Sequence, residues 1–239
     1  MVIDREHSID VSVVIPAFNE ALCITEAVRS SEESFSSAGH RVEIIVVDDG
    51  SVDATGDLAR GAGARVYRTA HNGKGSALRL GIKVSRGTQV VFCDADLPIL
   101  PYDLTQLVGA AKNSGTDVCV GRRSGRRALT LRSAAGRTYA AMWRLVVCSD
   151  TTDPQSPAKV LSGRAARDLA TMCSEDGYGF DSELIAHARR LGLSISEVDV
   201  QWKDLRARLR TFAVLRLSLI HAGKLLRYRR ILATGRVLD

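Results

Sequence analysis

Two carboxylates stand two residues apart at Asp94 and Asp96, directly after the apolar run at residues 89–93. Such a run is typical of a buried strand, so the acidic pair is expected on an exposed turn at its end. Paired carboxylates on a turn can hold a hard divalent cation such as Mg²⁺ or Mn²⁺. A cation bound to a diphosphate would neutralise the charge that grows on this leaving group, although two acids in a turn are more often simply solvated.

A second acidic run follows the apolar segment 43–47 and reads Asp48-Asp49-Gly50-Ser51. A carboxylate at the end of a strand can accept hydrogen bonds from a nucleobase or from ribose hydroxyls. Its alternative role is to cap the helix that follows. Both roles stay open at this point.

A lysine lies among glycines in Asn72-Gly73-Lys74-Gly75, at the start of a helical segment. Backbone N–H groups at a helix start, together with the ammonium of Lys74, can face a phosphate. The GxxxxGK[ST] spacing of a P-loop is absent, which argues against a kinase or NTPase. An ordinary glycine turn is the alternative.

Alternating strands and helices must position these residues. The apolar runs at 11–16, 43–47, 64–68 and 89–93 predict strands, and the segments 19–38, 53–61 and 74–85 predict helices between them. This alternation favours an α/β fold of the Rossmann-like nucleotide-binding type, with a mostly parallel central sheet flanked by helices. Ligand groups then gather at the carboxyl ends of the strands, where both acidic runs lie.

The second half continues with fewer clear signals. Helices are expected at 102–114, 130–148, 163–172 and 181–191, and strands at 117–120 and 195–202. Asp181 and Glu183 can act as a base if an acceptor hydroxyl lies nearby, but capping of the helix that begins at 181 is the favoured role for at least one of them.

Composition sets further bounds. The 239 residues, 45% hydrophobic and 25% charged, suit one globular domain. An odd number of scattered cysteines, five in all, fits a reduced, cytoplasmic compartment. Neither a signal peptide nor an apolar stretch long enough to span a membrane is expected.

The net charge of +6 is concentrated in residues 122–137 and 203–236. We expect a catalytic domain at 1–202 and a basic amphipathic helical extension of that domain at 203–239. Such a helix can lie on the inner face of an anionic membrane, or pack on the domain with its basic face in water. A nucleic-acid partner is not expected, because aromatic residues make up only 5% and no reader motif is present.

Taken together, these motifs resemble the family 2 inverting glycosyltransferases with the GT-A fold. The resemblance covers about residues 11–204, and within the family the chain looks most like the polyprenyl-phosphate (dolichyl-phosphate) mannose and glucose synthases. Its later motifs include Gly121-Arg122-Arg123 and Gly177-Tyr178-Gly179-Phe180-Asp181. Residues 153–159 and Gly136 differ from the pattern of that branch. The resemblance therefore identifies the donor more firmly than the acceptor.

The resemblance implies a role for each site residue. Asp94 and Asp96 hold the metal and act in catalysis with Asp181, and Arg123 and Arg132 receive an acceptor phosphate. The nucleotide sugar is bound by Pro16, Phe18, Glu20, Asp49, Lys74, Asp94, Ala95, Asp96 and Arg210.

Three functions follow from this reading. The first is transfer of mannose or glucose from GDP-mannose or UDP-glucose to a polyprenyl phosphate, with inversion and with Mg²⁺ or Mn²⁺. The second is a related transferase that acts on a hydroxyl of a soluble metabolite or cell-wall glycan, for which Asp181 or Glu183 would be the base. The third, less favoured, is a sugar nucleotidyltransferase. The oligomeric state is left open.

Overall fold

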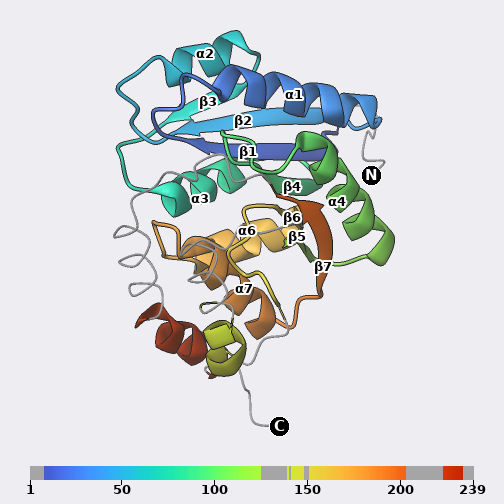
Figure 1. Ribbon diagram of the computed structural model, residues 1–239, viewed down its shortest axis with the longest axis vertical. Coiled ribbons are helices and arrows are strands. Elements are labelled where there is room, and N and C mark those ends of the chain that lie inside the picture. Colours follow the sequence, from blue (N-terminus) through green and yellow to red (C-terminus); the bar gives the residue numbers. More distant parts are fainter. Residues whose placement is uncertain (1–7, 125–138, 140, 148–150, 203–222, 234–239) are drawn as a thin grey trace, which may run out of the picture.

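The computed structural model describes residues 8–124, 139, 141–147, 151–202 and 223–233. In these residues seven strands form one sheet in the order β3-β2-β1-β4-β6-β5-β7 (Figure 1). The strands are β1 (Val11–Ala17), β2 (Val42–Asp48), β3 (Arg65–Arg68), β4 (Gln89–Phe92), β5 (Val118–Ser124), β6 (Lys159–Ser162) and β7 (Ile195–Gln201). The helices are α1 (Ile24–Ser37), α2 (Thr55–Gly61), α3 (Lys74–Val84), α4 (Pro101–Ser114), α6 (Gly163–Met172) and α7 (Phe180–Arg190).

Helices cover both faces of this sheet, which explains why its central strands are continuous apolar runs. In β1, Val13 and Ile15 pack with α1, α2 and α4, whereas Val14 faces α3, α6 and α7. Successive side chains of a strand point to opposite faces, so both sets must be apolar. Figure 1 shows the two helical layers on either side of the sheet. The expected α/β fold with a mostly parallel sheet is confirmed.

Strand β6 is the main element that the sequence pattern missed. It runs antiparallel to both β4 and β5, whereas the other paired strands are parallel, so the sheet is mixed. With only four residues and a lysine at its start, β6 has no pattern that distinguishes it from the loop before α6. Because it runs against its neighbours, its first residue, Lys159, lies level with Phe92 near the carboxyl end of β4.

The other predicted elements of the described chain are present, with shifted ends. The largest shift is in α1, which begins at Ile24 and not at Asn19. Asn19 has a left-handed backbone with φ of 56° and its side-chain oxygen accepts a hydrogen bond from the N–H of Val52. Residues 18–23 therefore form a loop that a helical spacing of apolar side chains did not reveal.

Two further helical segments lie at 141–147 and 223–233. Leu225 and Tyr228 from the second segment are buried in the core with Trp143, and Tyr228 donates a hydrogen bond to the carbonyl of Gly179 at 3.1 Å. This part of the basic C-terminal region thus packs on the domain. The division at 202/203 stays a prediction, because residues 203–222 lie outside the described chain, and no helix within the described residues is long and apolar enough to cross a membrane.

Candidate functional site

The acidic turn lies directly beyond β4, as expected. The N–H of Leu97 donates to the carbonyl of Asp94 at 3.1 Å, which closes a turn with Ala95 and Asp96 at its centre. Leu97 has a left-handed backbone with φ of 47°. It and Asn19 are the two non-glycine residues of the described chain with positive φ, and each follows a predicted site residue, Asp96 or Phe18. Backbone strain of this kind is concentrated at functional sites.

Lys74 lies at the first residue of α3 and reaches toward the acidic turn. Its ammonium is 2.7 Å from a carboxylate oxygen of Asp94 and 3.9 Å from one of Asp181. Burial alone would lower the pKa of Lys74, but the two carboxylates outweigh burial and raise it, so the side chain stays charged. The structure therefore brings together three predicted site residues that are far apart in the sequence.

Asp181 is held from its other side by Lys159. The Lys159 ammonium donates to Asp181 Oδ1 at 2.8 Å and also to the carbonyl of Ser156, while its side chain is fully buried. Burial lowers the pKa of Lys159 more than Asp181 raises it. The expected cap at the start of α7 is absent, since no side chain caps this helix and Asp181 pairs with lysine.

Glu183 does not serve as a cap either. Its carboxylate accepts hydrogen bonds from the backbone N–H groups of Ser174 and Glu175 at 2.9 and 2.8 Å, and Arg227 pairs with it at 2.8 Å. The side chain of Glu183 is 1% exposed. It therefore ties the loop before α7 to the segment 223–233.

Asp49 lies at the carboxyl end of β2 and is almost fully buried. Its carboxylate accepts hydrogen bonds from the backbone N–H groups of Asn72 and Gly73 at 2.9 and 2.8 Å, and it lies 3.0 Å from His71 Nδ1. Much of its hydrogen-bonding capacity is thus used to shape the loop that carries Lys74. The sequence analysis did not identify His71 as part of the site.

Phe18 and His71 form an aromatic pair above the ends of β1 and β3. Their ring centroids are 3.9 Å apart with an angle of 22° between the planes, and both rings are substantially exposed. An exposed, stacked pair of this kind offers a flat surface to a nucleobase. Nearby, Pro16 is the half-buried penultimate residue of β1, and the carboxylate of Glu20 accepts a hydrogen bond from the Cys23 thiol.

Glycines allow the Lys74 loop to approach the loop before α7. The N–H of Gly75 donates to the carbonyl of Asp176 at 2.7 Å, and a Cβ at Gly75 would lie 2.3 Å from the carbonyl oxygen of Glu175. Gly73 has φ of +111° and would meet the same stretch of backbone. Any side chain at either position would push the two loops apart.

Arg123 is on the far side of the site, near the end of β5. Its Nε and Nη2 groups donate to the two carboxylate oxygens of Asp153 at 2.6 and 2.5 Å, and its guanidinium lies 5.1 Å from the ring centre of Trp202. Burial favours the neutral forms of Arg123 and Asp153, but the ion pair between them outweighs burial. The pair raises the pKa of Arg123 and lowers the pKa of Asp153. Arg132 and Arg210, also predicted site residues, lie outside the described residues.

The donor set at the acidic turn fits a hard divalent cation. Asp94 and Asp96 are both partly exposed and offer carboxylate oxygens, the ligands that Mg²⁺ and Mn²⁺ prefer. The described residues contain no group of three or more acidic, histidine or cysteine side chains that could enclose an ion. Such a turn suits a cation that takes its remaining ligands from water and from substrate phosphates, as Mg²⁺ usually does.

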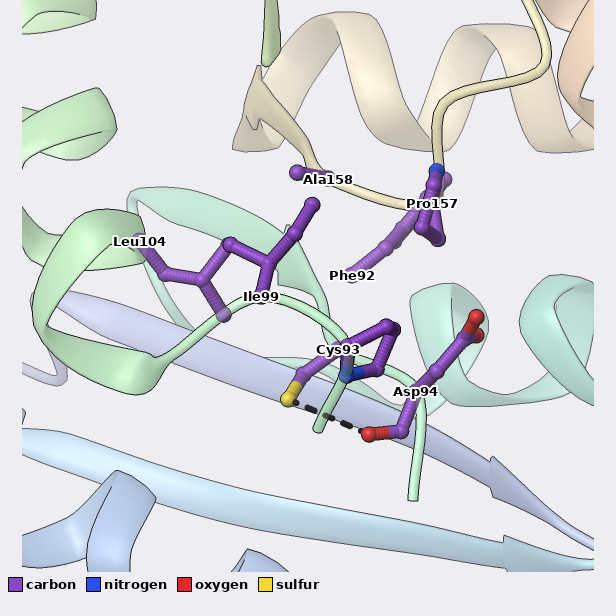
Figure 2. A pocket seen from close by; sticks show the side chains of 8 residues that line it. Phe92, Cys93, Asp94, Ile99, Leu104, Pro157 and Ala158 are labelled. Atoms are coloured by element: carbon purple, nitrogen blue, oxygen red, sulfur yellow. Dashed lines mark hydrogen bonds between the residues drawn. The ribbon is translucent and has the colours of Figure 1, made fainter. Parts of the chain in front are cut away.

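A small hollow lies beside Asp94 (Figure 2). Its walls are mostly apolar and include Ile99, Leu104, Pro157 and Ala158. In Figure 2 the carboxylate of Asp94 points away from Ile99 and Leu104.

Sequence comparison places this site in a known family. The glycosyl transferase family 2 model matches residues 12–161. Glycosyltransferase AglD of Haloferax volcanii is 30% identical over 207 residues, which cover 82% of this chain but 33% of AglD. The chain thus spans about a third of the length of that relative. Dolichyl-phosphate beta-glucosyltransferase of Drosophila melanogaster is 31% identical over 85% of this chain and 70% of its own.

Solved structures agree with the sequence match. Glucosyl-3-phosphoglycerate synthase from Mycobacterium tuberculosis, crystallised with Mn²⁺, uridine diphosphate and glucosyl-3-phosphoglycerate, superposes with a TM-score of 0.73. The two proteins are 28% identical, and the match covers 93% of this chain and 80% of the other. The family match over more than half of the residues and the superposition of the fold lead to one conclusion: the chain belongs to glycosyl transferase family 2 and has a GT-A-like fold.

Proposed function

We propose that this protein is an inverting glycosyltransferase that moves a hexose, mannose or glucose, from a nucleotide-diphosphate sugar to a polyprenyl phosphate. The observation that carries this proposal is the set of charges around Asp94, Lys74 and Asp181 at the open edge of the sheet. Relatives whose names include dolichyl-phosphate and undecaprenyl-phosphate sugar transferases support the choice of acceptor.

In this proposal the donor lies over β1, β2 and β4. Phe18 stacks on the nucleobase, with Pro16, Glu20 and Asp49 around the nucleoside. Lys74 and the backbone at Ala95 face the diphosphate, and Arg210 covers the donor from the region beyond β7. GDP-mannose and UDP-glucose are the donors we favour.

Asp94 and Asp96 would hold Mg²⁺ or Mn²⁺ in the same proposal. Such a cation supplies Lewis-acid neutralisation of the diphosphate as the sugar leaves. The chain's own residues orient the donor: Lys74 lies 2.7 Å from Asp94, close enough to move onto a diphosphate oxygen. The metal-bound solved relative supports this assignment.

The surroundings of Asp181 support a phosphate acceptor over a hydroxyl. A hydroxyl must give up its proton to a base, whereas a phosphate monoester is already ionised near neutral pH and needs none. Asp181 Oδ1 is bonded to Lys159 and Oδ2 lies 3.9 Å from Lys74. Both carboxylate oxygens of Asp181 thus face ammonium groups, so we assign this residue an electrostatic role.

Arg123 and Arg132 are the proposed acceptor-phosphate residues. Arginine suits this task because its planar fork matches two phosphate oxygens. The carboxylate of Asp153 already accepts two hydrogen bonds from the guanidinium of Arg123, so an acceptor phosphate would compete with this carboxylate. In the proposal Arg132 therefore carries the larger share of phosphate binding.

A soluble acceptor is the second candidate. The similarity to glucosyl-3-phosphoglycerate synthase, which was crystallised with phosphoglyceric acid, favours it. A peripheral position on the inner face of the membrane belongs to the first candidate and draws on the basic segment 223–233, whose Arg229 and Arg230 are exposed.

One assay separates these candidates. The protein is incubated with radiolabelled GDP-mannose or UDP-glucose, with Mg²⁺ or Mn²⁺, and with or without a short polyprenyl phosphate. We expect label to enter the organic phase only when lipid and metal are both present. With 3-phosphoglycerate as acceptor, label that moves from the donor into this acceptor would favour the soluble candidate. Absence of metal-dependent use of any donor would overturn the proposal.

A further inference from the structure

Lys159 is a buried charge that no step of the proposed reaction uses. It is the first residue of β6, its side chain has no exposure to water, and its ammonium contacts Asp181 and the carbonyl of Ser156. Burying an ammonium is costly unless it is paired and hydrogen-bonded. Lys159 satisfies that condition at the site itself, level with the strand end that leads into Asp94.

Four charged groups form a continuous row from the core to the acidic turn. Lys159 lies 2.8 Å from Asp181, Asp181 lies 3.9 Å from Lys74, and Lys74 lies 2.7 Å from Asp94. Positive and negative groups alternate along this row. Removal of any one charge therefore changes the partner that the next group prefers.

Lys74 faces two carboxylates, those of Asp94 and Asp181, but in the proposed function it must also bind the donor diphosphate. In that function Asp94 would hold the cation, and the Lys74 ammonium would then bind oxygens of the diphosphate. A fully unpaired Asp181 only 3.9 Å away would hold that ammonium back, since charge attraction is strong where water is scarce. Lys159 neutralises Asp181 from the buried side and weakens this competing attraction.

We propose that Lys159 is a positioning residue that, by neutralising Asp181, leaves Lys74 free to transfer from Asp94 to the donor diphosphate. This inference rests on the proposed function for the donor and the metal, and it does not depend on the identity of the acceptor. Lys159 touches neither donor nor acceptor, so it acts through Asp181 and Lys74. A simple structural ion pair would instead affect folding alone.

The test measures binding of Mn²⁺ with UDP and of Mn²⁺ with GDP by calorimetry, using the whole chain. We expect Lys159→Met to raise the Kd of the nucleoside diphosphate that binds by about 10- to 100-fold, the range one charged contact usually carries. Lys83→Met, on the exposed side of α3, is the matched control and should leave Kd unchanged. Thermal unfolding of each variant shows whether it is folded.

Two further variants keep the test decisive if Lys159→Met folds poorly. Lys159→Met with Asp181→Asn removes both charges, so we expect its Kd to return to within about threefold of wild type. In a Lys74→Met background, Lys159→Met should cause no additional loss, because the residue through which it acts is gone.

Three outcomes would overturn the inference. One is wild-type affinity in a folded Lys159→Met variant, and another is additive losses of Lys159→Met and Lys74→Met. The third is a double variant that folds but binds as weakly as Lys159→Met. Failure of the proposed donor site is distinguishable, because then the wild-type protein itself would bind neither Mn²⁺-UDP nor Mn²⁺-GDP.

Discussion

From β1 to β4, Phe18, Asp49 and Asp94 lie within two residues of the carboxyl ends of parallel strands, which place them. From β5 to β7, the charged residues of the site are paired with one another across long stretches of sequence, as Arg123 is with Asp153 and Lys159 with Asp181. In the first region Phe18 is exposed and Asp94 and Asp96 are partly exposed, so these side chains are accessible to a ligand. In the second region the charged side chains pair with one another and hold loops in place.

This difference matches the division of labour in the proposal. A nucleotide and a metal can bind at strand ends, because a strand end places its side chains by local geometry. An acceptor must be distinguished by loops, and loops need cross-links to hold their shape. We therefore expect substitutions of the acidic turn and of Phe18 to damage chemistry, and substitutions that break the Arg123–Asp153 pair to damage stability first.

Asp96→Ala is expected to have the largest effect. An unchanged rate of sugar transfer in this variant would contradict the role that we give to the first region. Loss of a metal ligand should lower the transfer rate by about 10³-fold or more, since the charge on the leaving diphosphate would go unneutralised. The partly exposed position on a turn predicts an unchanged melting temperature. Transfer of radiolabelled sugar measures the rate, and Asp168→Ala, an exposed carboxylate of α6, is the control. Near-normal turnover would remove Asp96 from the metal site.

Asp153→Asn should have an intermediate effect, on stability. It removes the carboxylate charge that pairs with the largely buried guanidinium of Arg123, which typically costs about 3 kcal/mol. Asp199→Asn breaks the neighbouring but exposed pair with Arg122 and should leave the melting temperature unchanged, because exposed pairs contribute little. Equal effects of the two substitutions would contradict the role we assign to the second region.

The effect of Asp153→Asn on the melting temperature should depend on pH. Pairing with Arg123 outweighs burial and lowers the pKa of Asp153 below its ordinary value of 3.8. A carboxylate whose pKa is lower in the folded state stabilises the fold above the unfolded pKa and loses that contribution as pH falls through the folded one. The difference in melting temperature between wild type and Asp153→Asn should therefore be full at pH 6 and shrink below about pH 4. A difference that grows on acidification would show the pairing to be unimportant.

Phe18→Ala is expected to give the smallest of these effects and sharpens the account of the first region. Loss of one stacking surface should raise the KM for the donor about 10-fold and leave kcat unchanged, since stacking on a base is worth roughly 1–3 kcal/mol. His71→Ala removes the ring behind Phe18 and should raise KM less. Steady-state kinetics with varied donor concentration measures both, and a fall in kcat with constant KM would place Phe18 elsewhere in the reaction.

Short stretches of the sequence determine much of the fold of this protein. Apolar runs and the residues that end them predicted six of the seven strands described here, and the motifs at 16–20, 48–51 and 94–96 lie at the ends of β1, β2 and β4 as expected. This was possible because burial on both faces of a parallel strand imposes a continuous apolar run, and the acidic residue that follows must lie at the strand end.

Only the tertiary structure decided which charges face each other. Lys159 stands in a four-residue strand whose direction depends on its neighbours β4 and β5, and its partner Asp181 is supplied by α7. His71 joins the site because Asp49 and Phe18 come together from different strands. Pairing between distant segments leaves no period or spacing in the sequence, since it depends on strand order and direction, which form only when the sheet assembles.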